Sequence, residues 1–100
     1  MFAEMFSESI DIVKNKKITP GFKPSTRALV RILKVLADEG AEAKTMLSAN
    51  ANLNYSRLAK HIVWLEKKGL VESTIDKSHI KVGLTKKGRE FASTLLDVNL

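Results

Sequence analysis

The sequence predicts a single, mainly α-helical domain that carries one small β-hairpin. Its 100 residues match a common domain size and suffice for one hydrophobic core. Apolar residues make up an ordinary globular 44% of the chain and recur at helical spacing in several segments. Two short β-branched runs lie next to each other in the second half of the chain. A chain of this size leaves little room for an enclosed catalytic pocket.

Residues 1–24 are predicted to form an amphipathic helix and a linker that precede the main domain of residues 25–100. Apolar side chains recur at close to i, i+3, i+4 spacing over residues 2–14. They are Phe2, Met5, Phe6, Ile10 and Val13. Two prolines and one glycine in residues 15–24 break any helix, so we expect a linker there.

The main domain is predicted to begin with a helix over residues 26–39. Ser25 precedes this helix and can accept a hydrogen bond from a free backbone N–H group as an N-cap. Gly40 follows it at the position where a left-handed residue commonly ends a helix. The predicted buried stripe, at i, i+3, i+4, i+7 spacing, consists of Leu29, Ile32, Leu33 and Leu36.

A second, short helix is predicted over residues 43–49, and a tight turn should follow it. Three asparagines in residues 50–54 favour the turn, because asparagine tolerates a left-handed backbone, and Asn54 is placed to cap the next helix. The third helix is predicted from Tyr55 to Lys68, ending at Gly69, with a buried stripe of Leu58, Ile62 and Leu65. The opposite face carries Ser56, Arg57, Lys60, Val63, Trp64 and Lys67, with Tyr55 and His61 on its flanks.

Residues 70–75 and 79–84 are predicted to be two short strands that form a hairpin, because both are rich in β-branched and apolar residues. Thr85 is then placed to cap a last helix over residues 86–97. The apolar side of that helix includes Phe91, Leu95 and Leu96.

This order of elements is that of a helix-turn-helix followed by a wing. A third helix of this length can lie in the major groove of DNA, about 12 Å wide, while the second helix braces it across the backbone. The first residues of such a helix face the base edges. Arg57 can donate two hydrogen bonds to guanine, and Lys60 lies about one turn further along the same face. We therefore expect binding to double-stranded DNA.

The distribution of charge favours the same partner. The formal net charge is +6, and residues 54–88 hold eight basic and three acidic side chains, a net charge of +5. A polyanion suits such a block because each neutralised phosphate releases condensed counterions. The predicted DNA-contacting residues are Lys44, Thr45, Asn54, Tyr55, Ser56, Arg57, Lys60, His61, Lys77, His79, Lys81, Lys86 and Lys87.

Some of these residues have simpler explanations. Lysines around the hairpin tip also keep a hairpin soluble and its edges unpaired, and an exposed basic helix face is often only solvated. Lys86 and Lys87 oppose the dipole of the helix that they begin, which favours a phosphate contact slightly. Trp64 can pack under the hairpin, line a subunit contact or lie beside the DNA backbone.

Several other functions find no support in the sequence. The absence of cysteine excludes disulfides and thiolate sites, and the two histidines lack the further ligands of a zinc site, so we expect no metal and no cofactor. No catalytic motif or phosphate-binding glycine loop is present, and no small-molecule site is evident, so we expect no enzyme activity. No apolar run is long enough to span a membrane, and the N-terminus does not resemble a secretory signal, so we expect a cytoplasmic protein.

Three stretches resemble small archaeal winged-helix DNA-binding proteins, which are broadly MarR-like and include chromatin-type proteins and regulators of crenarchaeal viruses. They are Ala-Asn-Leu-Asn-Tyr-Ser at residues 51–56, Leu-Glu-Lys-Lys-Gly-Leu-Val at 65–71 and Leu-Thr-Lys-Lys-Gly at 84–88. The last motif is common to wider winged-helix groups, whereas the first is more specific. The resemblance covers about residues 26–98 and implies that residues 54–60 begin the recognition helix and that 75–80 form the wing.

The resemblance also implies a homodimer, which in that family often forms through a long C-terminal helix. Only about 15 residues follow Leu84 here, and an N-terminal amphipathic segment is added. We therefore expect a dimer contact made by Phe2, Met5, Phe6, Ile10 and Val13 together with Phe91, Leu95 and Leu96. The alternative is that the N-terminal segment folds back over its own core.

Three functions remain open on these grounds. The first is a sequence-preferring transcriptional regulator that reads two half-sites as a dimer. The second is a non-specific chromatin-type architectural protein, in which phosphate contacts dominate. The third is a protein-interaction module with the winged-helix fold.

Overall fold

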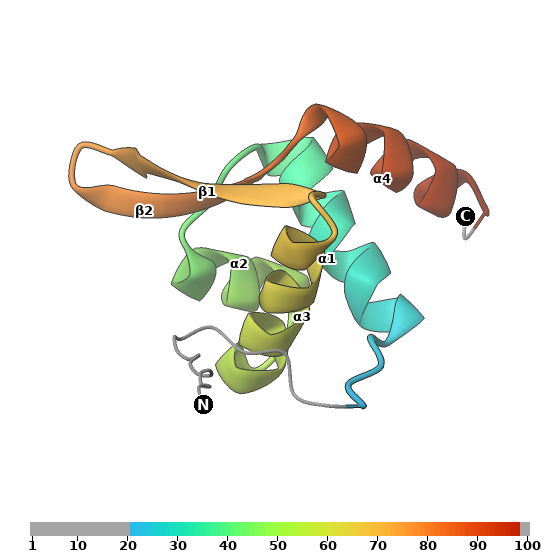
Figure 1. The fold of residues 1–100 in the computed structure, drawn as a ribbon. Coiled ribbons are helices and arrows are strands. Elements are labelled where there is room, and N and C mark those ends of the chain that lie inside the picture. The colour runs from blue at the N-terminus through green and yellow to red at the C-terminus, as the bar shows by residue number, and fades with distance from the viewer. Residues whose placement is uncertain (1–20, 99–100) are drawn as a thin grey trace, which may run out of the picture.

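The computed structural model describes residues 21–98 and shows four helices and a two-stranded antiparallel sheet in that range (Figure 1). The elements follow in the order α1 (Thr26–Glu39), α2 (Lys44–Ala51), α3 (Tyr55–Lys67), β1 (Val71–Asp76), β2 (His79–Leu84) and α4 (Lys86–Val98). The predicted mainly α fold with a hairpin is confirmed. The amphipathic segment predicted over residues 2–14 lies outside the described residues.

Three helices begin at the side-chain caps that the sequence predicts. The Ser25 hydroxyl accepts from the Ala28 N–H at 3.2 Å, and the Asn54 Oδ1 accepts from the Arg57 N–H at 2.7 Å. The Thr85 hydroxyl accepts from the Gly88 N–H at 2.9 Å. Each bond satisfies a backbone donor that a helix start leaves free, so these caps define where α1, α3 and α4 begin.

The hydrophobic core lies around α1, which packs against α2, α3, α4 and β2. The predicted stripes of α1 and α3 are both buried in this core. The largest fully buried side chains are Ile32, Leu33, Leu47, Leu58, Ile62, Leu65 and Val82. Because the stripe of α3 is buried along its length, that helix is held with its opposite face turned outward.

The turn between α2 and α3 is closed by backbone and side-chain hydrogen bonds. Asn52 adopts a left-handed backbone with φ of 56°, as the asparagine-rich sequence predicts. The Leu53 N–H donates to the Ser48 carbonyl at 3.0 Å, and the Arg31 guanidinium donates to the Asn52 carbonyl at 3.3 Å. α2 runs to Ala51, two residues beyond its predicted end. These bonds set the angle at which α3 leaves α2.

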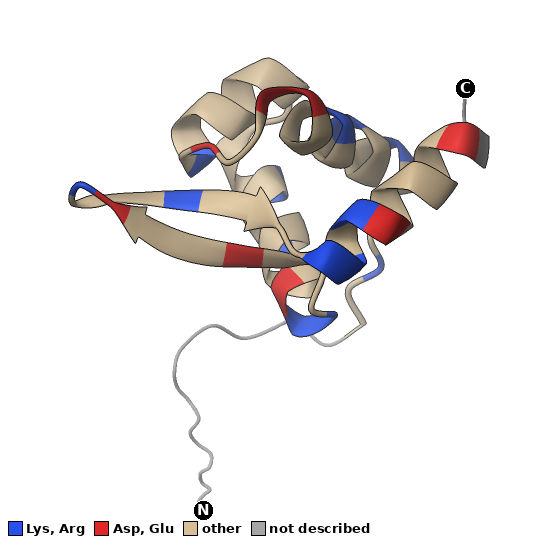
Figure 2. Ribbon diagram, turned by 90° about the horizontal axis from the view of Figure 1, so that it is seen from above, with Lys and Arg blue, Asp and Glu red and all other residues tan. Residues whose placement is uncertain are grey.

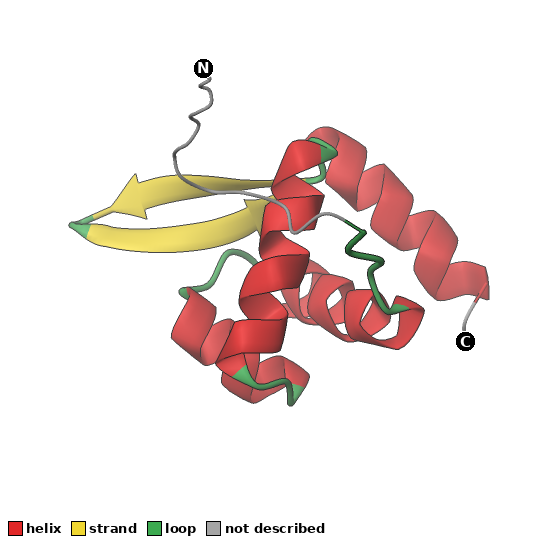
Figure 3. Ribbon diagram, turned by 60° about the horizontal axis from the view of Figure 1, so that its bottom comes forward, coloured by secondary structure: helices red, strands yellow, loops and turns green. Residues whose placement is uncertain are grey.

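The hairpin of β1 and β2, here called the wing, projects from the helical body beside α2, while α4 lies on the other side (Figures 1 and 3). Its pairing runs from Val71↔Leu84 at the base to Asp76↔His79 at the tip. Lys77 and Ser78 form a two-residue turn, and both have positive φ. An isolated bridge between Glu42 and Val82 ties the segment before α2 to the wing.

Candidate nucleic-acid interface

The first turns of α3 present an exposed basic face. Ser56, Arg57 and Lys60 are exposed, as predicted, while Leu58 and Ile62 on the opposite side are fully buried. Neither Arg57 nor Lys60 forms an ion pair with an acidic residue within the range 21–98. Their charges are therefore available to an anionic partner.

Asn54 and Tyr55 stand at the start of this face. The Oδ1 of Asn54 is used as the cap of α3, so its Nδ2 group is the part that can donate to DNA. Tyr55 is 50% exposed and is the first residue of α3, directly before Ser56 and Arg57. The structure therefore keeps both predicted residues at the surface.

His61 is a correction to the predicted site, because its side chain is only 3% exposed. The Ser25 N–H donates to its Nε2 at 3.0 Å, so its Nδ1 donates to the Arg57 carbonyl at 2.8 Å. The Phe22 ring also meets the imidazole edge-on, with ring centroids 5.2 Å apart. Because both ring nitrogens already have partners within the protein, the buried His61 side chain offers no free polar atom for the predicted DNA contact.

Two other residues predicted on the exposed face of α3 are half-buried, namely Val63 and Trp64. The Trp64 ring packs against the hydrophobic core. The Lys68 ammonium lies 5.5 Å from the centre of this ring, at cation–π distance. Val63 and Trp64 therefore interrupt the predicted face, which carries Ser56, Arg57 and Lys60 at the start of α3 and the exposed Lys67 at its end.

The start of α2 lies next to the wing. Backbone bonds join Glu42 and Val82 in both directions, at 3.0 and 2.8 Å. Lys44 and Thr45 follow two and three residues later; Lys44 is half-buried and Thr45 is exposed. The predicted contacts of α2 are thus placed between the wing and α3, on the side of the domain away from α4 (Figure 1).

The three predicted residues of the wing lie at or near its tip. Lys77 and His79 are exposed, and the His79 Nδ1 is 3.0 Å from the Lys77 carbonyl. The Lys81 ammonium pairs with Asp76 at 3.3 Å, so its charge is partly balanced within the protein. Figure 2 shows that basic and acidic residues alternate around the tip. Lys77 is the cation that extends furthest along the hairpin.

Lys86 and Lys87 lie at the other end of α3 from Arg57. The Lys87 ammonium donates to the Lys68 carbonyl at 3.1 Å. Lys68 caps the C-terminal end of α3. Because a helix rises 1.5 Å per residue, Lys68 lies about 16 Å along the helix axis from Arg57. The structure therefore does not bring these two lysines together with the first turn of α3.

Of the predicted dimer residues, those on α4 are half-buried. Phe91 and Leu95 pack against the core of their own chain, while Leu96 lines an apolar hollow of about 560 Å³ between α1 and α4. Phe2, Met5, Phe6, Ile10 and Val13 lie outside the described residues. The hollow leaves an apolar surface on the side of the domain away from the wing.

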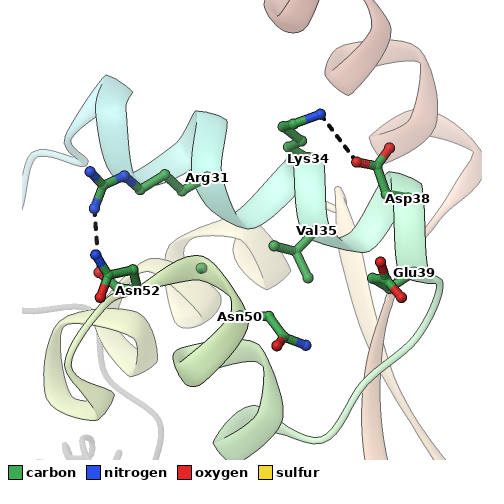
Figure 4. A pocket seen from close by; sticks show the side chains of 8 residues that line it. Arg31, Lys34, Val35, Asp38, Glu39, Asn50 and Asn52 are labelled. Atoms are coloured by element: carbon green, nitrogen blue, oxygen red, sulfur yellow. Dashed lines mark hydrogen bonds and ion pairs between the residues drawn. The ribbon is translucent and has the colours of Figure 1, made fainter.

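A residue that the sequence prediction missed lies beside the basic face. Lys23 lines the same hollow, of about 410 Å³, as Arg57 and Lys60. The sequence placed Lys23 in a linker, and nothing in its local pattern indicates that the linker returns to α3. A larger hollow of about 580 Å³ lies between α1 and α2, where Lys34 pairs with Asp38 (Figure 4).

No group of acidic or histidine side chains in the described residues could hold a metal ion. Within residues 21–98, no helix combines the length and the hydrophobicity that crossing a membrane requires. The exposed features of residues 21–98 are a basic helix face at the start of α3 and a projecting hairpin.

Comparisons with known proteins agree with this architecture. A family model described as winged helix-turn-helix matches residues 25–99. A MarR family transcriptional regulator from Silicibacter pomeroyi is 27% identical, with a TM-score of 0.64 over 73% of this chain and 53% of that one. The transcriptional regulator Tm0710 from Thermotoga maritima is 24% identical, with a TM-score of 0.63 over 80% and 54% of the two chains.

A further structure is that of BpsR from Bordetella bronchiseptica, whose DNA binding is regulated by 6-hydroxynicotinic acid. It is 21% identical, with a TM-score of 0.67 over 72% of this chain and 53% of that one. The present chain thus spans about half the length of these structures. No curated protein matches it. The predicted winged helix-turn-helix fold is confirmed.

Proposed function

Since the chain belongs to the winged helix-turn-helix family, we propose that it is a transcriptional regulator that binds double-stranded DNA. The observation that carries this proposal is the exposed face of Ser56, Arg57 and Lys60 on a helix whose other side is fully buried. Such a helix enters the major groove as a rigid body, and its first residues meet the base edges.

Two other parts of the surface support the same orientation. The start of α2, with Lys44 and Thr45, would cross the DNA backbone beside the groove. The wing, with Lys77 at its tip, would reach the next stretch of backbone or the minor groove. All three parts lie on the side of the domain away from α4 (Figure 1).

We further propose that the regulator prefers particular sequences and acts as a dimer. Arg57 supplies the bidentate donor that reads guanine, and two copies related by a two-fold axis would read half-sites about 34 Å apart. The apolar hollow between α1 and α4 and the apolar residues of segment 2–14 supply the dimer contact. Membership of the archaeal or archaeal-virus branch is part of this proposal.

One experiment tests the proposed function against its two alternatives. The affinity of the full chain for a random duplex and for duplexes selected from a random pool is measured between about 50 and 200 mM salt. A specificity ratio of about 10³ or more supports the regulator, and a ratio near unity supports the architectural protein. Affinity that does not fall as salt rises supports a protein-interaction module, since phosphate contacts make DNA binding salt-dependent.

A further inference from the structure

The segment that precedes α1 is held against the basic face of α3 by two contacts to one residue. The Ser25 N–H donates to the Nε2 of His61 at 3.0 Å, and the Phe22 ring packs edge-on against the His61 ring. His61 is itself held by its Nδ1 bond to the Arg57 carbonyl, 2.8 Å long. Lys23 lies between these two contacts in the sequence, so its backbone is fixed beside the first turns of α3.

This arrangement creates a hollow whose charged residues are all basic. Its volume is about 410 Å³, and its lining is Phe22, Lys23, Ser25, Asn54, Ser56, Arg57, Lys60 and His61. Two lysines and one arginine therefore meet there with no acidic side chain in the lining. Lys23, Arg57 and Lys60 are all exposed, so water screens them in the free protein, and an anion that enters the hollow would be attracted by all three.

The hollow between α1 and α2 provides a contrast within the same domain. Its lining includes Arg31 and Lys34 but also Asp38 and Glu39, so its charges balance (Figure 4). Lys34 pairs with Asp38 at 3.1 Å. A basic residue in that hollow already has a partner of opposite charge, whereas the cations beside α3 have none among its lining residues.

We propose that a backbone phosphate of the bound DNA occupies the hollow beside α3 and that Lys23 and Lys60 hold it. The proposal rests on the proposed function and adds to it the segment before α1. Lysine binds phosphate as a point charge, so these contacts fix the position of the domain on DNA without reading sequence. Arg57, on the wall of the same hollow, is left to reach the base edges.

The attraction comes from the side chains rather than from the start of the helix. The backbone N–H groups in the first turn of a helix lack partners within the helix. That of Arg57 already donates to the Oδ1 of the Asn54 cap at 2.7 Å, so it is not available to a phosphate. Lys23 belongs to a different segment and enters the hollow only because His61 binds Ser25 and contacts Phe22. His61 is therefore a positioning residue for Lys23 and does not itself touch DNA.

The test compares Lys23→Ala with Lys34→Ala, each of which removes one positive charge from an exposed lysine. The affinity of each full-length variant for one selected duplex is measured at several salt concentrations. Loss of one phosphate contact should reduce the slope of log K against log salt by about 0.9 and weaken binding roughly eightfold at 0.1 M salt. Lys34→Ala should leave the slope unchanged.

Equal slopes for Lys23→Ala and Lys34→Ala would overturn the inference. If the wild-type chain bound the duplex and Arg57→Ala weakened it while Lys23→Ala did not, this inference would fail and the proposed function would stand. A wild-type chain with no salt-dependent DNA binding would overturn both.

The positioning role of His61 has its own readout. His61→Leu should lower the salt slope by the same amount as Lys23→Ala, and adding Lys23→Ala to it should lower the slope no further. His61→Gln should restore the slope, because the amide oxygen can accept from the Ser25 N–H. If the double variant lost a further slope of about 0.9 relative to His61→Leu, the positioning role would be overturned. The comparison of Lys23→Ala with Lys34→Ala does not depend on whether His61→Leu folds.

Discussion

The carbonyl oxygen of Leu70 lies so close to Gly88 that a Cβ atom built on residue 88 would stand 1.8 Å from it. The same carbonyl accepts from the Thr85 N–H at 3.1 Å, and the Thr85 hydroxyl donates to the Gly69 carbonyl at 2.7 Å. These contacts dock the start of α4 on the corner between α3 and β1. The Leu-Thr-x-x-Gly motif therefore has a structural cause: threonine caps α4, and glycine permits the close approach.

Gly88→Ala should destabilise the domain by about 1–3 kcal/mol or more, because the added methyl group meets backbone that cannot rotate away. Denaturant unfolding of the variant measures the loss. Glu90→Ala, at an exposed position of the same helix outside the hollow between α1 and α4, is the control and should change stability little. Equal stability of the two variants would refute the proposed close packing of α4.

Asn54 combines a structural role with a proposed DNA contact, and two substitutions separate them. Asn54→Ala removes the cap of α3 and should cost about 0.5–2 kcal/mol of stability. Asn54→Asp keeps a capping oxygen but brings a negative charge to the DNA surface, so stability should hold while DNA affinity falls. Thermal unfolding and DNA titration of both variants check this. Unchanged affinity of Asn54→Asp would place residue 54 outside the interface.

Arg57→Ala should weaken binding to a selected duplex by about 1–3 kcal/mol and relax its base preference, with little change in stability because the side chain is exposed. Arg57→Lys keeps the charge but loses the planar pair of donors, so it should keep most of the salt dependence and still lose preference. Arg27→Ala, exposed on α1 and outside the hollow, serves as the control. Selection from random DNA provides the measurement, and an unaltered selected sequence for Arg57→Ala would contradict the assignment.

Ser78→Gly should stabilise the domain by about 0.5–1 kcal/mol. Ser78 has a φ of 69° in the turn of the wing, a conformation that glycine adopts at no steric cost. Glu90→Gly, inside α4 and outside the hollow between α1 and α4, is the control and should destabilise by about 1 kcal/mol, because glycine is unfavourable inside a helix. Denaturant midpoints of the two variants should thus move in opposite directions, and a lower midpoint for Ser78→Gly would argue against the turn geometry.

Deletion of residues 1–14 should shift the chain from dimer to monomer while its helical core stays folded. The segment carries five apolar residues at helical spacing, and the buried core residues of the described range lie between Ala28 and Ala92. Sedimentation at several protein concentrations measures the change, and circular dichroism verifies the fold. A truncated chain that remains dimeric would assign the contact to α4 instead.

Much of the fold follows from patterns that are local in the sequence. Ser25, Asn54 and Thr85 cap the helices that they precede, because a capping oxygen needs only a backbone N–H two or three residues away. The stripes of α1 and α3 are buried as their spacing predicts. The asparagines before α3 predict the left-handed residue at position 52.

The sequence predicted the DNA-contacting residues less completely than it predicted the fold, and His61 shows why. On a helical wheel, position 61 lies at the flank between the buried stripe and the exposed face, so periodicity alone leaves its environment open. Its burial depends on residues 22–25, which are 36 or more positions away in the sequence. Lys23 was missed for the same reason, and Lys86 and Lys87 lie beyond the far end of the basic face because α4 docks at Leu70.

The amino-acid sequence by itself therefore determined the order and extent of the elements, the caps and the side of α3 that points inward, because these depend on neighbours within a turn or two. Only the tertiary structure decided which flank of α3 is covered and which cations share a hollow. Those outcomes depend on the segment before α1 and on α4, and their contacts with α3 span distances along the chain over which no periodic pattern extends.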